Sequence, residues 1–256
     1  MAYFFGINST SFKSELTISR FQNSGLRNDE LLVYSYEIKD SKWEINLVEC
    51  NYDKNFYYLN EDNIDNRKIF FLATLKEVSN YNFDSLKTFN SFTKSSPAFR
   101  CNFKIINSKN GFSSYQSEYP PDMSNKKGSV ISSVFALTNK YADNNFVVFR
   151  NVFHKPIEIP FSIFIVDMKD KVVLDKFIAI TNQTTLIELN DKNLGSDCYL
   201  VSEDYLGIPQ YLSQKNNHLS LEHTHPPHAY ILSNDRFEKI NLLKKNALKI
   251  INNSNC

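Results

Sequence analysis

The sequence predicts a mainly β protein built from antiparallel β-sandwiches, with an amphipathic helix near its C-terminus. Aromatic residues make up 14% of the 256 residues. Apolar residues alternate with polar ones over most of the chain, which is the pattern of half-buried strands. The alternation breaks between residues 107 and 128, where glycine, proline and serine gather. We therefore expect two β domains, residues 1–122 and 126–233, followed by a helix at 235–251.

In the N-terminal half, the alternation is clearest in two consecutive segments, residues 32–38 and 43–47. The polar residues 39–42 between them predict a hairpin turn. Residues 69–75 form a continuous apolar run, which suits a strand that is covered on both faces. In residues 99–105 every second residue is apolar, so these side chains are expected to point into one core.

The C-terminal half has seven further strand-like segments with turns every 8–12 residues, the spacing of a β-sandwich or barrel. The turn at residues 168–171 predicts a hairpin. The seven expected strands are residues 130–137, 146–153, 161–167, 172–180, 185–189, 198–201 and 219–225.

The period changes to that of a helix after residue 234. Phe237, Ile240, Leu243, Ala247 and Ile250 share one face of this predicted helix, and lysines gather on the other face. We expect the apolar face to pack over a sheet or against a neighbouring subunit.

Composition and missing motifs exclude several classes of function. With 29 basic and 28 acidic residues, the chain has no net field to attract nucleic acid. It has no apolar stretch of about 20 residues to span a membrane and no basic leader at its start. We therefore expect a cytoplasmic protein without nucleic-acid or membrane partners. Six glycines do not supply GxGxxG or GxxxxGK[ST], and neither GxSxG nor HExxH occurs.

Four of the five histidines, His218, His223, His225 and His228, lie within eleven positions. In an extended chain His223 and His225 share a face, about 6.5 Å apart, so both can reach one ion. Three hypotheses stay open for this segment. It can hold a divalent metal such as Zn, Fe or Ni with His228 as a further ligand, or form a metal-free ligand pocket. Alternatively, it is an edge strand and loop whose histidines have only a structural role.

Residues 113–122 form a second candidate site. Tyr115, Gln116 and Tyr119 precede two prolines in a segment rich in hydroxyl groups. Tyrosine offers a large contact area with a polar tip, so a ligand-facing surface is one interpretation. An interdomain linker is the other.

The leading functional hypothesis is a soluble, non-catalytic binding module. It would recognise a polar small molecule or glycan through the histidine-rich and tyrosine-rich loops. The first alternative is a metal-dependent enzyme with the metal at His223 and His225 and with Glu222 or Glu118 as the base. The second alternative is an oligomeric structural scaffold, in which the helix and the sheet edges join copies of the chain.

Overall fold

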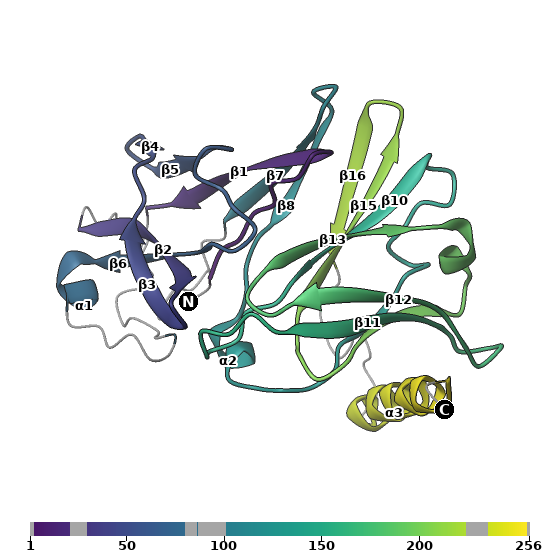
Figure 1. The fold of residues 1–256 in the computed structure, drawn as a ribbon. Coiled ribbons are helices and arrows are strands. Elements are labelled where there is room, and N and C mark those ends of the chain that lie inside the picture. Colours follow the sequence, from purple (N-terminus) through teal and green to yellow (C-terminus); the bar gives the residue numbers. More distant parts are fainter. Residues whose placement is uncertain (1–2, 21–29, 80–85, 87–100, 224–234, 255–256) are drawn as a thin grey trace. The chain divides into compact units, whose positions relative to one another are not determined.

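The computed structural model describes residues 3–20, 30–79, 86, 101–223 and 235–254. These residues form four small antiparallel sheets and a C-terminal helix, so the mainly β prediction is confirmed (Figure 1). No helix in this part of the chain is both long and apolar enough to cross a membrane.

The chain divides into two compact units, and the first includes two short segments from the C-terminal half of the sequence. The first unit combines Met1–Lys126 with Val152–Glu158 and Thr181–Thr184, and the second unit contains the remaining residues. Two short segments of the C-terminal half of the sequence thus pack with the N-terminal half.

The first unit contains a five-stranded sheet, ordered β4-β5-β1-β7-β8, and a three-stranded sheet, ordered β3-β2-β6. Its elements are β1 (Phe12–Ser19), β2 (Leu31–Lys39), β3 (Lys42–Leu47), β4 (Asn51–Tyr52), β5 (Phe56–Leu59), β6 (Ile69–Thr74), α1 (Leu75–Ser79), β7 (Asn102–Asn107), β8 (Phe112–Gln116) and α2 (Pro121–Ser124).

Two predictions for this unit are confirmed. The hairpin expected at residues 32–47 is β2–β3, with Ile38 paired to Trp43 and with Asp40 and Ser41 at positive φ in its turn. The apolar run expected to be covered on both faces is β6, which is buried at five consecutive positions.

The second unit contains two four-stranded sheets, ordered β13-β10-β15-β16 and β12-β11-β14-β9. The hairpin predicted around residues 168–171 is β11–β12. The elements are β9 (Ile131–Ser133), β10 (Asn144–Arg150), β11 (Pro160–Asp167), β12 (Val172–Ile180), β13 (Thr184–Leu189), η2 (Asp191–Leu194), β14 (Cys198–Ser202), β15 (Ile208–Lys215), β16 (His218–His223) and α3 (Arg236–Ser254).

The prediction of two β-sandwiches is wrong. The four small sheets are the set of elements from which a four-bladed β-propeller is built. In a two-layer sandwich each strand keeps an outer face, whereas β10 is buried at six consecutive positions and β15 at its first six. Alternation of apolar and polar residues identifies a strand, but it does not tell which strands join into one sheet.

Several elements were not predicted from the sequence. The break in alternation at residues 107–128 contains β8 and α2. Before β8, Asn107 closes a tight turn by accepting hydrogen bonds from the backbone N–H groups of Lys109 and Gly111. Strands β1, β5 and β15 were missed. In β15, Pro209 and the polar residues Gln210 and Ser213 interrupt the apolar pattern.

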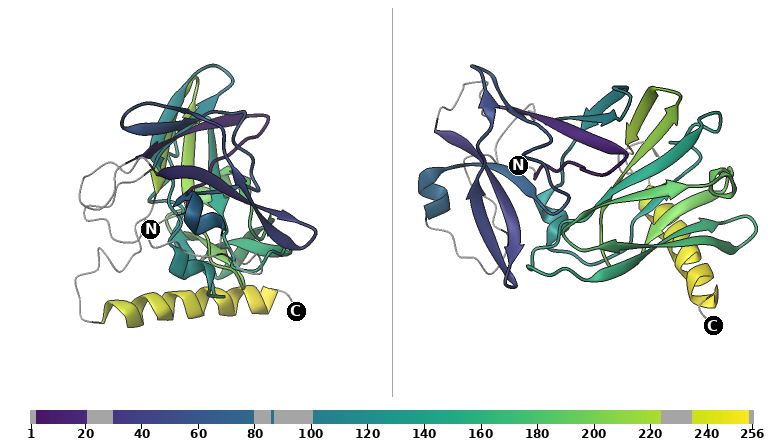
Figure 2. Two further views of the ribbon diagram at one scale, coloured as in Figure 1. Left: turned by 90° about the vertical axis from the view of Figure 1, so that its left-hand side faces the viewer. Right: turned by 45° about the horizontal axis from the view of Figure 1, so that its top comes forward.

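The C-terminal helix is confirmed as α3, a single long helix (Figure 2). Ala247 and Ile251 on its apolar face are fully buried against Phe164, Val166 and Val201 of β11 and β14. The helix is therefore held to its sheet by the stripe of apolar residues that predicted it.

Candidate functional site

One face of the five-stranded sheet is buried, and the other, which we call the open face, is accessible to solvent. Phe12, Leu16 and Ile18 of β1 point into the core and are each 1% exposed. Lys13 is exposed and Thr17 partly exposed on the opposite face. The open face is therefore the part of this sheet that a ligand can approach.

A row of polar side chains crosses the open face in register. Thr17 of β1 lies opposite Tyr58 of β5 on one side and Asn102 of β7 on the other. Tyr58 lies opposite Asn51, and Asn102 lies opposite Gln116. Residues directly opposite in neighbouring strands share a face, so these five side chains form one row, which we call the polar row. It spans about 19 Å across five strands.

A second row of the open face contains an ion pair. Glu15 lies opposite Lys104, which lies opposite Ser114. The ammonium group of Lys104 is 2.9 Å from the carboxylate of Glu15. The same ammonium group lies 5.1 Å from the ring centroid of Phe112, a residue that is 62% exposed at the start of β8. The charges in the middle of the open face therefore largely compensate one another.

The ring of Tyr58 is held in place by Asp53. The Tyr58 hydroxyl donates a hydrogen bond of 2.8 Å to Oδ2 of Asp53, and Oδ1 of Asp53 accepts from the backbone N–H groups of Asn55 and Phe56. The bond from Asn55, followed by those from Tyr58 and Phe56, lowers the pKa of Asp53. The bond to Asp53 raises the pKa of Tyr58. The ring is 40% exposed, so it is both anchored and accessible.

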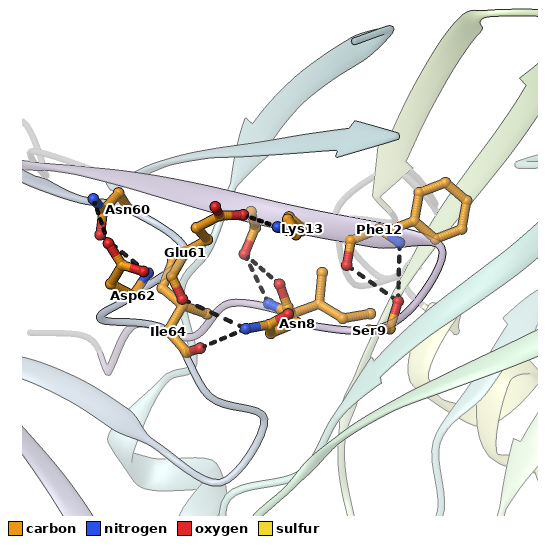
Figure 3. Close-up of polar contacts among 10 residues, drawn as sticks. Asn8, Ser9, Phe12, Lys13, Asn60, Glu61, Asp62 and Ile64 are labelled. Atoms are coloured by element: carbon orange, nitrogen blue, oxygen red, sulfur yellow. Dashed lines mark hydrogen bonds and ion pairs between the residues drawn. The ribbon is translucent and has the colours of Figure 1, made fainter. Parts of the chain in front are cut away.

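A groove of about 540 Å³ lies at the end of the sheet where β1 begins (Figure 3). We call it the polar groove, because most of its lining side chains carry hydroxyl, amide or charged groups. Lys13 and Glu15 belong both to the open face and to this groove, so the two form one continuous surface. The polar part of its lining includes Thr10, Ser11, Lys13, Glu15, Asn60, Glu61, Asp62, Asn107, Ser108 and Asn110.

The wall of the polar groove after β5 is fixed by hydrogen bonds from side chains to the backbone. The amide of Asn8 donates to the carbonyl groups of Glu61 (3.4 Å) and Ile64 (3.3 Å). The amide oxygen of Asn60 accepts from the backbone N–H of Asp62 at 3.1 Å. Figure 3 shows the Asn8 bonds joining the turn to the segment that precedes β1, and the Asn60 bond within the turn. A ligand would thus meet a preformed wall, which limits the entropy lost on binding.

Glu61 stands between two hollows of the first unit. It forms an ion pair with Lys13 across the polar groove (Figure 3). Glu61 and Asp62 also line a second hollow of about 460 Å³, which extends to Arg67 and Lys68. Both hollows thus mix acidic and basic side chains rather than presenting one sign of charge.

The structure brings one of the three ligand residues predicted in the tyrosine-rich segment to the open face. Gln116 is the last residue of β8 and belongs to the polar row. Tyr115 lies opposite the buried Phe103, on the face that points into the core. Tyr119 is fully buried, and its backbone pairs with that of Tyr3. Glu118, the alternative catalytic base, is half-buried between them.

Two histidines of the histidine-rich segment, His218 and His223, are the first and last residues of β16. His223 is half-buried opposite Gln210, and its neighbour Glu222 is exposed. His225 and His228 lie outside the described residues. Among the described residues, no group of three or more histidine, cysteine, aspartate or glutamate side chains could hold a metal ion. The ligand and metal roles assigned to His223, His225 and His228 stay predictions.

Sequence reasoning missed most of the polar row. Asn102 falls in the strand expected at residues 99–105, whereas no strand was expected around Thr17 or Tyr58. The three residues stand in different strands, far from one another in the sequence. Their parity within each strand already placed them on the side opposite the apolar residues. Only the register of the sheet shows that they lie beside one another.

Comparison of the chain with protein-family models, with curated proteins and with solved structures gives no match. What the molecule binds is therefore inferred from the chemistry of its own site. The strand residues of the open face include neither histidine nor cysteine, and its charged side chains pair with one another. Amide, hydroxyl and aromatic side chains of this kind can form hydrogen bonds and ring contacts with a ligand.

Proposed function

We propose that the chain is a non-catalytic binding module for a polar small molecule or glycan, held by the open face and the polar groove. The observation that carries the proposal is the polar row, in which three amides, one threonine and the anchored ring of Tyr58 stand in register. A sugar ring presents hydroxyl groups that both donate and accept hydrogen bonds, as amide side chains do. Its C–H groups can also pack on an aromatic ring.

The charges of the site favour a neutral ligand. Lys104 pairs with Glu15, and Lys13 pairs with Glu61. A strongly charged ligand would have to break these pairs or lie close to a like charge, which costs free energy. A neutral polyhydroxy compound can bond to the amides and hydroxyl groups while leaving both ion pairs intact.

The proposal is tested by measuring sugar binding to the full chain and to variants of the polar row. Calorimetric titration with a panel of neutral oligosaccharides should find a ligand, and Asn102→Ala should weaken its binding by about tenfold, the effect of losing one or two hydrogen bonds. Thr17→Val, which keeps the shape of the side chain, should weaken binding severalfold.

The matched control is Asn246→Ala, which makes the same change at an exposed position of α3. This variant should bind as the unchanged protein does, and all variants should unfold at similar temperatures. Equal affinities of the Asn102→Ala and Asn246→Ala variants would contradict the placement of the ligand on the open face.

A further inference from the structure

Two exposed aromatic rings stand far apart on the open face. Tyr58 belongs to the polar row. Phe112 pairs with Ile106, which pairs with Lys13. The row of Tyr58 crosses β1 at Thr17 and the row of Phe112 crosses it at Lys13, four residues away. Across the sheet, the strands that carry the two rings are three strands apart. At about 3.3 Å per residue and 4.8 Å per strand, the separation is about 19 Å along the diagonal.

The surface between the two rings is continuous and polar. The Glu15–Lys104 ion pair lies in the row between them. Tyr58, at one end of the diagonal, is 40% exposed, and Phe112, at the other end, is 62% exposed. The polar groove joins the same surface at Lys13 and Glu15. One sugar unit is too short to contact both rings, whereas an extended chain of units can cross the whole face.

We infer that the ligand is a neutral linear oligosaccharide, bound across the open face with Tyr58 and Phe112 as stacking platforms for two separate sugar units. This inference rests on the proposed function and adds the length and the shape of the ligand. Because each ring contacts a different unit, affinity depends on the length of the chain, and each ring contributes only when the chain reaches it.

The experiment titrates the full chain with unbranched cello-, xylo- and manno-oligosaccharides, from monosaccharide to hexasaccharide. In the series that binds, affinity should rise at least tenfold from the disaccharide to the hexasaccharide, as the second ring comes into contact. Phe112→Ala should reduce the hexasaccharide affinity about fivefold to tenfold and leave the disaccharide affinity nearly unchanged wherever Tyr58 holds the shorter ligand.

The matched control is Phe237→Ala, which removes a ring that is 53% exposed on α3 and should change neither affinity. Sugar binding that does not depend on chain length, or that Phe112→Ala leaves unchanged for the hexasaccharide, would overturn this inference while the proposed function stands. Failure of every sugar to bind would overturn the proposed function itself and this inference with it.

Discussion

The hydroxyl group of Tyr58 donates its hydrogen bond to an aspartate, Asp53, whose other oxygen closes the turn between β4 and β5. Because Asp53 is stabilised as a carboxylate, its pKa in the folded protein lies below that of the unfolded chain, about 3.9. Its contribution to stability is fully present above that value and is lost as the pH falls through the lower folded pKa. We expect the Tyr58 ring to lose its anchor in the same acidic range.

This relationship is checked by following the Tyr58 ring by NMR as a function of pH. In the unchanged protein the pKa of Tyr58 should lie above the ordinary value of about 10, because the bond to Asp53 favours the protonated hydroxyl. Asp53→Asn should bring it back toward that value. Tyr58→Phe identifies the signal by removing it, and an unchanged Tyr58 titration in Asp53→Asn would show that Asp53 does not hold the ring.

A second prediction concerns Asn182, which joins the two short segments 152–158 and 181–184 of the first unit to each other. Its side chain accepts a hydrogen bond from the backbone N–H of Phe153 (2.7 Å) and donates to the carbonyl groups of Lys155 and Ile157 (3.0 and 2.9 Å). The residue is 1% exposed. Asn182→Ala should lower the free energy of unfolding by about 3 kcal/mol, because buried backbone groups lose their partners.

The control for Asn182→Ala is Asn216→Ala. Both residues have positive φ, 63° and 53°, so both substitutions carry the cost of a left-handed alanine, about 1 kcal/mol. The Asn216 side chain makes no hydrogen bond within the described part of the chain, so its replacement should cost only this strain. Urea unfolding of both variants gives the difference, and equal losses of stability would mean that the Asn182 hydrogen bonds contribute little.

A third prediction concerns the packing of α3. Ile251 is fully buried in the cluster that joins the helix to β11 and β14. Ile251→Ala should cost about 3 kcal/mol of unfolding free energy through lost burial and the cavity left behind. Leu242→Ala on the exposed side, where Leu242 is 59% exposed, should change stability by less than about 0.5 kcal/mol. Similar losses in both variants would contradict the assignment of the two faces.

The sequence predicts local structure well where the apolar residues of a segment are the ones that the element buries. The β2–β3 hairpin, the doubly covered β6 and the apolar face of α3 are of this kind. Strand β15 does not follow this rule, because its polar residue Gln210 is fully buried. A buried amide is stabilised by partners elsewhere in the fold, which a single segment does not reveal.

The candidate site was harder to predict for the same reason. Gln116 was identified because it stands in a short segment rich in tyrosine and proline. Thr17 and Asn102 are as polar as Gln116, but they become neighbours only through the register of β1, β7 and β8. Which strands pair depends on tertiary packing, so neither the sheets nor a site that crosses them follows from alternation alone.

The last prediction separates the two ligand hypotheses for the histidine-rich segment. A metal site at His223 and His225 predicts about one equivalent of Zn, Fe or Ni per chain in protein purified without a histidine tag. We expect much less than one equivalent of metal, because His223 lies opposite Gln210 in the sheet. An amide is a poor ligand for these ions beside imidazole. Elemental analysis before and after EDTA treatment measures the metal content.

A metal-free pocket at the same segment predicts a different result. Sugars or organic acids should then raise the melting temperature, and this shift should be lost in the His223→Ala, His225→Ala double variant. His218→Ala is the matched control, since His218 is exposed at the opposite end of β16. Stoichiometric metal that the double variant loses would contradict our expectation and favour the metalloenzyme. If the double variant retains the ligand shift and Asn102→Ala abolishes it, the binding site lies on the open face, because removing both imidazole rings would leave the ligand's contacts intact.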